Sequence, residues 1–194
     1  MRRLFSLLLS AVFLFALTGT VRAHPGHPHP EPEVDEFDDE AVLSAATHPF
    51  TGVDHVLAML AAGLLASVAD RRLGAGFVGA MGLGFAVGYA PAGWLPALAA
   101  AAAGFLLLGG SPSPNAGLWA LVAVIGFWLG GAHAARMGGF SSGLGLCLGT
   151  AIGVWLGAGA ASGLKFLSPL GTRVAGGAVL TTGLLLAGAR LFPA

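Results

Sequence analysis

The feature that most constrains this chain is a series of six apolar runs, separated by short breaks that carry turn-forming residues. The runs cover residues 55–69, 73–89, 94–108, 117–135, 141–164 and 170–191. Only 9% of all residues are charged and 56% are hydrophobic, whereas a soluble domain carries about 25% charged residues. A bilayer can accept so much apolar surface, so we predict an all-α membrane protein with about six transmembrane helices.

The N-terminal residues have the pattern of a secretory signal. Arg2 and Arg3 precede a short apolar stretch, and Val21-Arg22-Ala23 offers a small-residue cleavage site. We therefore predict a cleaved signal peptide at 1–23, an acidic, histidine-bearing extracytoplasmic tail at 24–46, and the six-helix domain at 47–194. An uncleaved first helix stays open as an alternative. The prolines and acids of the tail predict a flexible segment, with a short helical lead-in at 41–46.

The distribution of charged residues limits the possible binding partners and indicates the orientation of the chain in the membrane. All but two of the nine acidic residues lie between Glu31 and Glu40, and no basic run could follow nucleic acid. The single cysteine, Cys147, excludes a disulfide framework within the chain. With the tail outside, more basic residues face the cytoplasm than face outward, as the positive-inside rule requires. Those facing the cytoplasm are Arg71, Arg72, Lys165 and Arg173, and those facing outward are Arg136 and Arg190.

Glycines at a spacing of four residues predict close helix packing. Gly145, Gly149, Gly153 and Gly157 place one smooth stripe on the fifth run. Such stripes let another backbone approach closely, so we expect a tight bundle with little room for a large channel. The same faces could also join copies of the chain. Shorter versions of the pattern are Gly84 with Gly88 and Gly126 with Gly130.

The candidate chemistry lies at the entry to the first run, in the sequence His48-Pro49-Phe50-Thr51-Gly52-Val53-Asp54-His55. Pro49 disfavours helix at His48, and Thr51 is expected to cap the following helix, with Asp54 in an arrangement like a capping box. The turn could bring the His48 ring back towards Asp54 and His55. Imidazoles with a carboxylate suit Ni, Co, Cu or Zn. A plain helix cap with two interfacial histidines stays open as an alternative.

Two further histidines could contribute to metal binding. His133 lies near the outer end of the fourth run, on the same side of the membrane as His48, Asp54 and His55. An interfacial histidine is the alternative there. His24, at the mature N-terminus, would offer an amine and an imidazole as a chelating pair, and the alternative is a solvated linker.

The motif at residues 48–55 resembles one in the HupE/UreJ family of small bacterial membrane proteins. That family carries a signal peptide, a mature end beginning with His, and HPxxGxDH entering its first helix. A second family motif, FHGxAHGxE, corresponds to residues 128–136. Here Gly130, Ala132 and His133 match it, but Leu129 and Arg136 replace a His and a Glu. The acidic residue often found in the family's third helix is also absent from residues 94–110.

The resemblance implies uptake of nickel, in some members cobalt, to supply hydrogenase or urease, with His48, Asp54 and His55 handling the metal. We therefore predict a secondary permease for Ni²⁺ or Co²⁺ in the bacterial inner membrane, with its mature N-terminus in the periplasm. No enzymatic activity and no tightly bound cofactor are expected, and the partners are the metal ion and the lipid bilayer. A non-transporting metal-binding accessory protein is one alternative. An intramembrane zinc hydrolase is another, although the sequence contains no HExxH.

Overall fold

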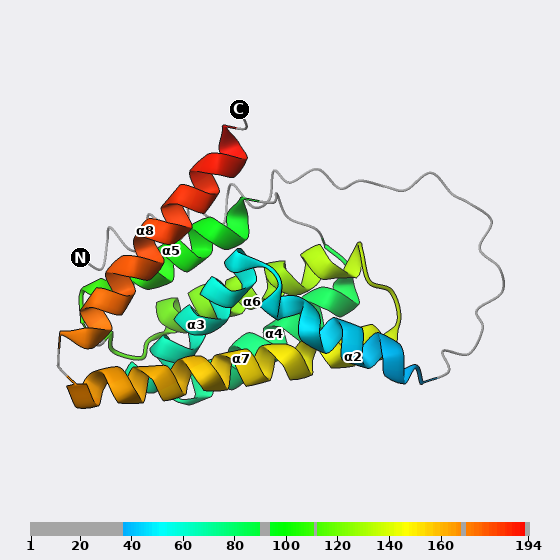
Figure 1. Cartoon of the computed structure of the whole chain (residues 1–194), viewed down its shortest axis with the longest axis horizontal. Coiled ribbons are helices and arrows are strands. Elements are labelled where there is room, and N and C mark those ends of the chain that lie inside the picture. The colour runs from blue at the N-terminus through cyan, green and yellow to red at the C-terminus, as the bar shows by residue number, and fades with distance from the viewer. Residues whose placement is uncertain (1–36, 90–93, 111, 168–169, 193–194) are drawn as a thin grey trace.

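The computed structural model describes residues 37–89, 94–110, 112–167 and 170–192, and these form helices and turns without a strand among them. The all-α part of the prediction is thus confirmed. The signal peptide predicted at 1–23 and the tail histidine His24 lie outside the described residues. The elements are α2 (Asp39–Thr47), the 3-10 helix η1 (His48–Phe50), α3 (Val53–Val68), α4 (Arg72–Val87), α5 (Leu95–Leu108), α6 (Ala116–Ala134), α7 (Phe140–Leu167) and α8 (Gly171–Leu191) (Figure 1).

The six predicted apolar runs correspond in order to α3 through α8, because each break carries residues that start or stop a helix. The Asn115 side chain caps α6 by accepting a hydrogen bond from the Leu118 N–H at 3.0 Å. Asp70 accepts from the Arg72 N–H at 2.9 Å at the start of α4. Pro96 lies in the first turn of α5, where a missing backbone N–H costs nothing.

Helix length separates the elements into two groups. Among the described residues, α6, α8 and the part Phe140–Gly163 of α7 are each long and apolar enough to cross a bilayer. The segments Asp39–Phe50 and Val53–Val68 pass the same test together, bent by 80° at the break between them. Helices α4 and α5 are apolar but shorter. Length and composition therefore support three crossings, or four with the bent pair, and six crossings stay a prediction.

The direction of the helices alternates along the chain. Pairs of neighbouring residues on packed helices show that α4 and α6 are parallel, that α7 runs opposite to α4, and that α8 runs opposite to α5. These pairs are Gly126–Phe77, Gly130–Met81, Cys147–Gly82, Val154–Gly74, Gly104–Leu180 and Gly183–Ala97. Alternation is what short loops produce when successive helices cross the same layer. It also puts the start of α3 and the ends of α6 and α8 at one end of the bundle.

Both parts of the bent pair, α2 and α3, pack on the predicted glycine stripe of α7 (Figure 1). Gly145 and Gly149 lie against the backbone of α2, at Val42 and Ala46. Further along, Gly153 lies against the Met59 side chain of α3, and Gly157 lies against the α3 backbone. A Cβ at Gly145, Gly149 or Gly153 would collide with the neighbouring helix, and a Cβ at Gly157 would lie 3.0 Å from the α3 backbone, so close packing through the stripe is confirmed.

Helix α2 starts earlier and packs more closely than the sequence predicts. The predicted boundary between tail and helical domain, at residue 46, falls inside α2. Asp38 caps the helix by accepting from the Glu40 and Ala41 N–H groups at 2.9 and 3.0 Å. The Asp38 N–H donates to the Ser141 hydroxyl at 3.0 Å, which ties the start of α2 to the start of α7.

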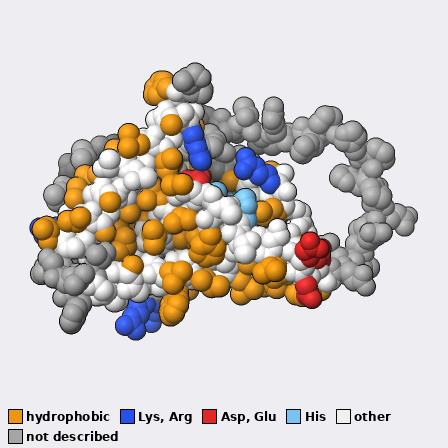
Figure 2. All heavy atoms as spheres, viewed as in Figure 1, with side chains coloured by type: hydrophobic (Ala, Val, Ile, Leu, Met, Phe, Trp, Pro, Cys, Tyr) orange, Lys and Arg blue, Asp and Glu red, His pale blue; other side chains and the backbone are white. Residues whose placement is uncertain are grey.

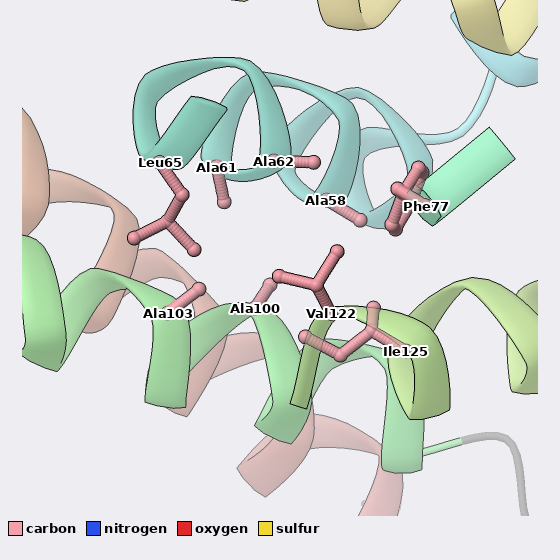
Figure 3. Close-up of a pocket in the computed structure, with 9 residues that line it drawn as sticks. All are labelled: Ala58, Ala61, Ala62, Leu65, Phe77, Ala100, Ala103, Val122 and Ile125. Carbon is pink, nitrogen blue, oxygen red and sulfur yellow. The ribbon is translucent and has the colours of Figure 1, made fainter. Parts of the chain in front are cut away.

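A small apolar cavity lies between α3, α4, α5 and α6 (Figure 3). Its lining contains only alanine and larger apolar side chains, and Figure 3 shows them pointing towards a common space. The lining residues are Ala58, Ala61, Ala62, Leu65, Phe77, Ala100, Ala103, Val122 and Ile125. With no polar side chain in this lining, the cavity offers a bare ion no ligand in this arrangement.

Candidate metal-binding site

The junction between α2 and α3 differs from the predicted helix cap. The N-cap of α3 is Gly52, which has extended backbone and makes no side-chain cap hydrogen bond. The Thr51 hydroxyl instead donates backwards to the His48 carbonyl at 2.7 Å. The capping-box prediction for Thr51 and Asp54 is therefore wrong, because η1 ends at Phe50 and holds Thr51 in its own last turn.

Gly52 has a specific steric role in the motif. A Cβ built on Gly52 would lie 2.6 Å from His55 Nδ1 and 3.0 Å from Asp54 Oδ1. Both distances are too short for ordinary contact. The absence of a side chain at this position thus leaves room for the Asp54 and His55 side chains to fold back over the start of α3.

Three imidazole rings meet at this end of the bundle. The ring centroids of His48 and His55 are 5.9 Å apart, those of His48 and His133 are 5.1 Å apart, and those of His55 and His133 are 4.5 Å apart. The rings come from η1, α3 and the last turn of α6, and each pair packs edge to face. The three histidines that the sequence analysis places on one side of the membrane are therefore neighbours in the structure.

In two of the three rings, one nitrogen is held by a hydrogen bond. His133 is buried, and its Nδ1 bonds the backbone carbonyl of Leu129. His55 Nδ1 lies 3.1 Å from Asp54 Oδ1. A carbonyl or carboxylate oxygen only accepts, so Nδ1 is the donor in both contacts, and the neutral form of each ring has its lone pair on Nε2. Metal-binding histidines in proteins commonly show this arrangement, in which the second nitrogen is held by an acceptor.

The Asp54 carboxylate is buried and bridges two cationic or donor groups. Its second oxygen, Oδ2, lies 3.0 Å from a guanidinium nitrogen of Arg190 in the last turn of α8. In the sequence analysis Arg190 serves only to orient the chain in the membrane, and the ion pair with Asp54 is missed. The available signal was the alternation of helices, which places the end of α8 at the same end of the bundle as the start of α3. Figure 2 shows acidic, basic and histidine side chains gathered in this region of an otherwise largely apolar surface.

Two other side chains that lie near these residues in the sequence are not ligands in the cluster. Helix α6 ends at Ala134, and Arg136 lies in the exposed turn beyond it, where its charge acts on the His48 and His133 rings. Met59 is buried against Gly153 of α7. As the side chains stand, no three His, Cys, Asp or Glu donors among the described residues are grouped closely enough to hold a metal ion. The rings pack against each other instead of pointing three nitrogens at one position.

Comparison with known proteins gives a single result. No curated protein and no solved structure matches the chain. The model of the HupE / UreJ protein family matches residues 12–186, which include all of α2 to α7 and most of α8. Since this match covers most of the sequence, the chain belongs to the HupE/UreJ family.

Proposed function

We propose that this membrane protein is a secondary transporter for Ni²⁺, or for Co²⁺, and that His48, His55 and His133 form its ion-binding site. The HupE/UreJ family is associated with nickel and cobalt uptake or with accessory roles, and it is not a known enzyme family. The observation that carries the proposal is the meeting of three imidazoles from three separate elements. Imidazole nitrogen is a preferred ligand of both metals.

In our proposal Asp54 holds a ligand of the metal without contacting the metal itself, whereas the sequence analysis named Asp54 as a direct ligand. Its carboxylate holds the His55 ring through Nδ1 and leaves Nε2 to the metal. It also supplies the one negative charge in the sequence between residue 40 and Asp70. Rotation of the His48 ring, together with small changes in the tilt of the other two rings that keep their Nδ1 hydrogen bonds, would turn the edge-to-face cluster into a set of ligands around one ion.

Passage of the ion towards the cytoplasm requires the helices to move. The cavity beyond the site is lined by apolar side chains alone, and dehydrated divalent ions do not cross such a region. The helices that would move are packed through glycines, so they can slide with little side-chain interlocking. The sequence contains no nucleotide-binding motif. An ion gradient, the membrane potential or a partner would supply the energy.

The orientation proposed here places the site on the periplasmic side of the bacterial inner membrane. Arg71 and Arg72 lie at the turn between α3 and α4, at the other end of α3 from Asp54. By the positive-inside rule that turn faces the cytoplasm. The start of α3 and the site then face the periplasm, where the metal enters.

Ion uptake into proteoliposomes tests the function. Purified protein is reconstituted into liposomes that contain a Ni²⁺-responsive dye, and protein-free liposomes provide the baseline. Wild-type protein is expected to give influx above this baseline, and the His48→Ala/His55→Ala double variant is expected to abolish it. Equal influx for the two proteins would reject this site.

A non-transporting accessory protein is the second candidate, and a specific observation favours it. Arg190 already neutralises Asp54, while Leu129 and Arg136 replace a His and a Glu of the family's second motif. These features weaken a cation site without removing its imidazoles. This candidate predicts Ni²⁺ binding in detergent with no flux into the same liposomes.

A further inference from the structure

The ion pair between Arg190 and Asp54 joins the last helix to the histidine cluster. The Asp54 side chain is 9% exposed and is held on both sides, by His55 at Oδ1 and by Arg190 at Oδ2. The Arg190 side chain is 40% exposed, so its guanidinium lies where the buried site meets the surface. Neither the family's motifs nor the sequence pattern assigns Arg190 a part in the site.

A divalent ion and this guanidinium would use the same negative charge. Beyond Glu40 the chain contains only two acidic residues, Asp54 and Asp70, and Asp70 lies in the turn between α3 and α4. An imidazole that ligates a metal ion is neutral and contributes no charge. A divalent ion among the rings therefore has Asp54 as its nearest counter-charge, and the guanidinium already bound there repels it.

We infer that Arg190 is a tethered cation that competes with the metal ion for Asp54, so that metal entry drives Arg190 off the carboxylate. This inference rests on the proposed ion site and deepens it. The Arg190 side chain can leave because it is partly exposed, and a long basic side chain that turns to the surface keeps its charge solvated. Displacement breaks this one ion pair between α8 and α3, which makes the contact sensitive to the bound ion.

The same competition makes the site select ions by their charge and by their affinity for imidazole. A monovalent ion brings one charge and binds imidazole weakly, so it does not offset the loss of the charge-assisted bond between Arg190 and Asp54. A divalent transition metal brings two charges and gains imidazole ligands. Arg190 is thus a specificity-determining residue that favours divalent transition metals over the more abundant monovalent ions.

Titration calorimetry of Ni²⁺ into the full chain in detergent tests the inference. Removal of the competing charge in Arg190→Gln should tighten Ni²⁺ binding by about tenfold or more. Arg190→Lys keeps the charge and should bind like wild type. Arg173→Gln is the matched control, because it removes the same charge at the opposite end of the same helix, and it should leave the affinity unchanged.

Addition of guanidinium provides a second measurement. Millimolar guanidinium should weaken Ni²⁺ binding to Arg190→Gln by refilling the vacated place, and it should have no effect on wild type. The same titration on Asp54→Asn should show no guanidinium effect. If Arg190→Gln is poorly folded, Arg190→Ala purified in millimolar guanidinium measures the same charge effect, because dialysis that removes the guanidinium should tighten Ni²⁺ binding.

The possible outcomes separate the inference from the proposed function. Suppose that the Ni²⁺ affinity of wild type depends on His48 and His55. Ni²⁺ binding by Arg190→Gln that is equal to or weaker than that of wild type then overturns the role of Arg190, and the proposed ion site is retained. Absence of Ni²⁺ and Co²⁺ binding by both wild type and Arg190→Gln overturns both. Tighter binding that guanidinium reverses supports the inference.

Discussion

The packing of α2 on α7 makes the position of His48 depend on a glycine in another helix. Gly149 lies against Ala46, which precedes His48 by two residues. A Cβ on Gly149 would lie 2.8 Å from the Ala46 carbonyl carbon and 3.0 Å from its Cα, whereas ordinary contact begins near 3.4 Å. The closest clash is with the carbonyl oxygen. Because the clashing atoms are backbone, α2 itself has to move, by roughly 1 Å, to accept Gly149→Ala.

Such a shift exceeds what the histidine cluster can absorb. Functional side chains have to stay within about 0.5 Å of their working geometry, and η1 follows α2 directly. We expect Gly149→Ala to lower the free energy of unfolding by about 1–3 kcal/mol and to weaken Ni²⁺ binding by about tenfold.

Both quantities can be measured on the same purified protein. Unfolding in SDS–detergent mixtures gives the stability, and titration calorimetry gives the affinity. Gly159→Ala is the matched control, since Gly159 is in the same helix but a Cβ there meets nothing within 4 Å. If Gly149→Ala matches Gly159→Ala in both measurements, the arrangement of α2 on the glycine stripe is wrong.

Three further predictions concern the site itself. Gly52→Ala places a methyl group against His55 Nδ1. It should weaken Ni²⁺ binding by about tenfold, with little change in the helicity measured by circular dichroism. Unchanged Ni²⁺ affinity would contradict the steric role of Gly52. Asp54→Asn should weaken binding by about 10–100-fold in calorimetry, while Asp70→Asn, at the opposite end of α3, should not, and equal effects would argue against a role for Asp54. Ni²⁺ at a hundred times its dissociation constant should stabilise wild type by about 2.7 kcal/mol. EDTA should reverse this shift in melting temperature, His55→Ala should lack it, and a shift that persists in His55→Ala would place the metal elsewhere.

Much of the helical framework follows from the sequence because hydropathy and breakers are local signals. The apolar runs correspond to α3 through α8, and Asn115 and Pro96 start their helices as turn chemistry predicts. The glycine spacing in α7 correctly predicts a contact face. Each of these signals is carried by residues within a few positions of the feature they specify.

The remaining features depend on contacts between distant segments. The acidic composition before residue 41 predicts a solvated tail, but Ser141 and the glycines of α7 give α2 a surface on which to pack. Thr51 has the sequence position of a helix cap, but the bend at Pro49 commits its hydroxyl to His48. The ion pair of Asp54 with Arg190 spans nearly the whole helical part of the chain. No local pattern encodes that pair.

The order in which the helices are synthesised determines when this ion pair can form during membrane insertion. Asp54 is made at the start of α3, whereas Arg190 follows only at the end of α8. A charged side chain costs about 2.5–3.5 kcal/mol at the centre of a membrane helix on insertion scales, whereas Asp54 is in the first turn of α3. An unfinished chain therefore keeps the start of α3 near water, and arrival of α8 lets the carboxylate settle among the helices. In this way a helix made later completes the environment of a residue in a helix made earlier.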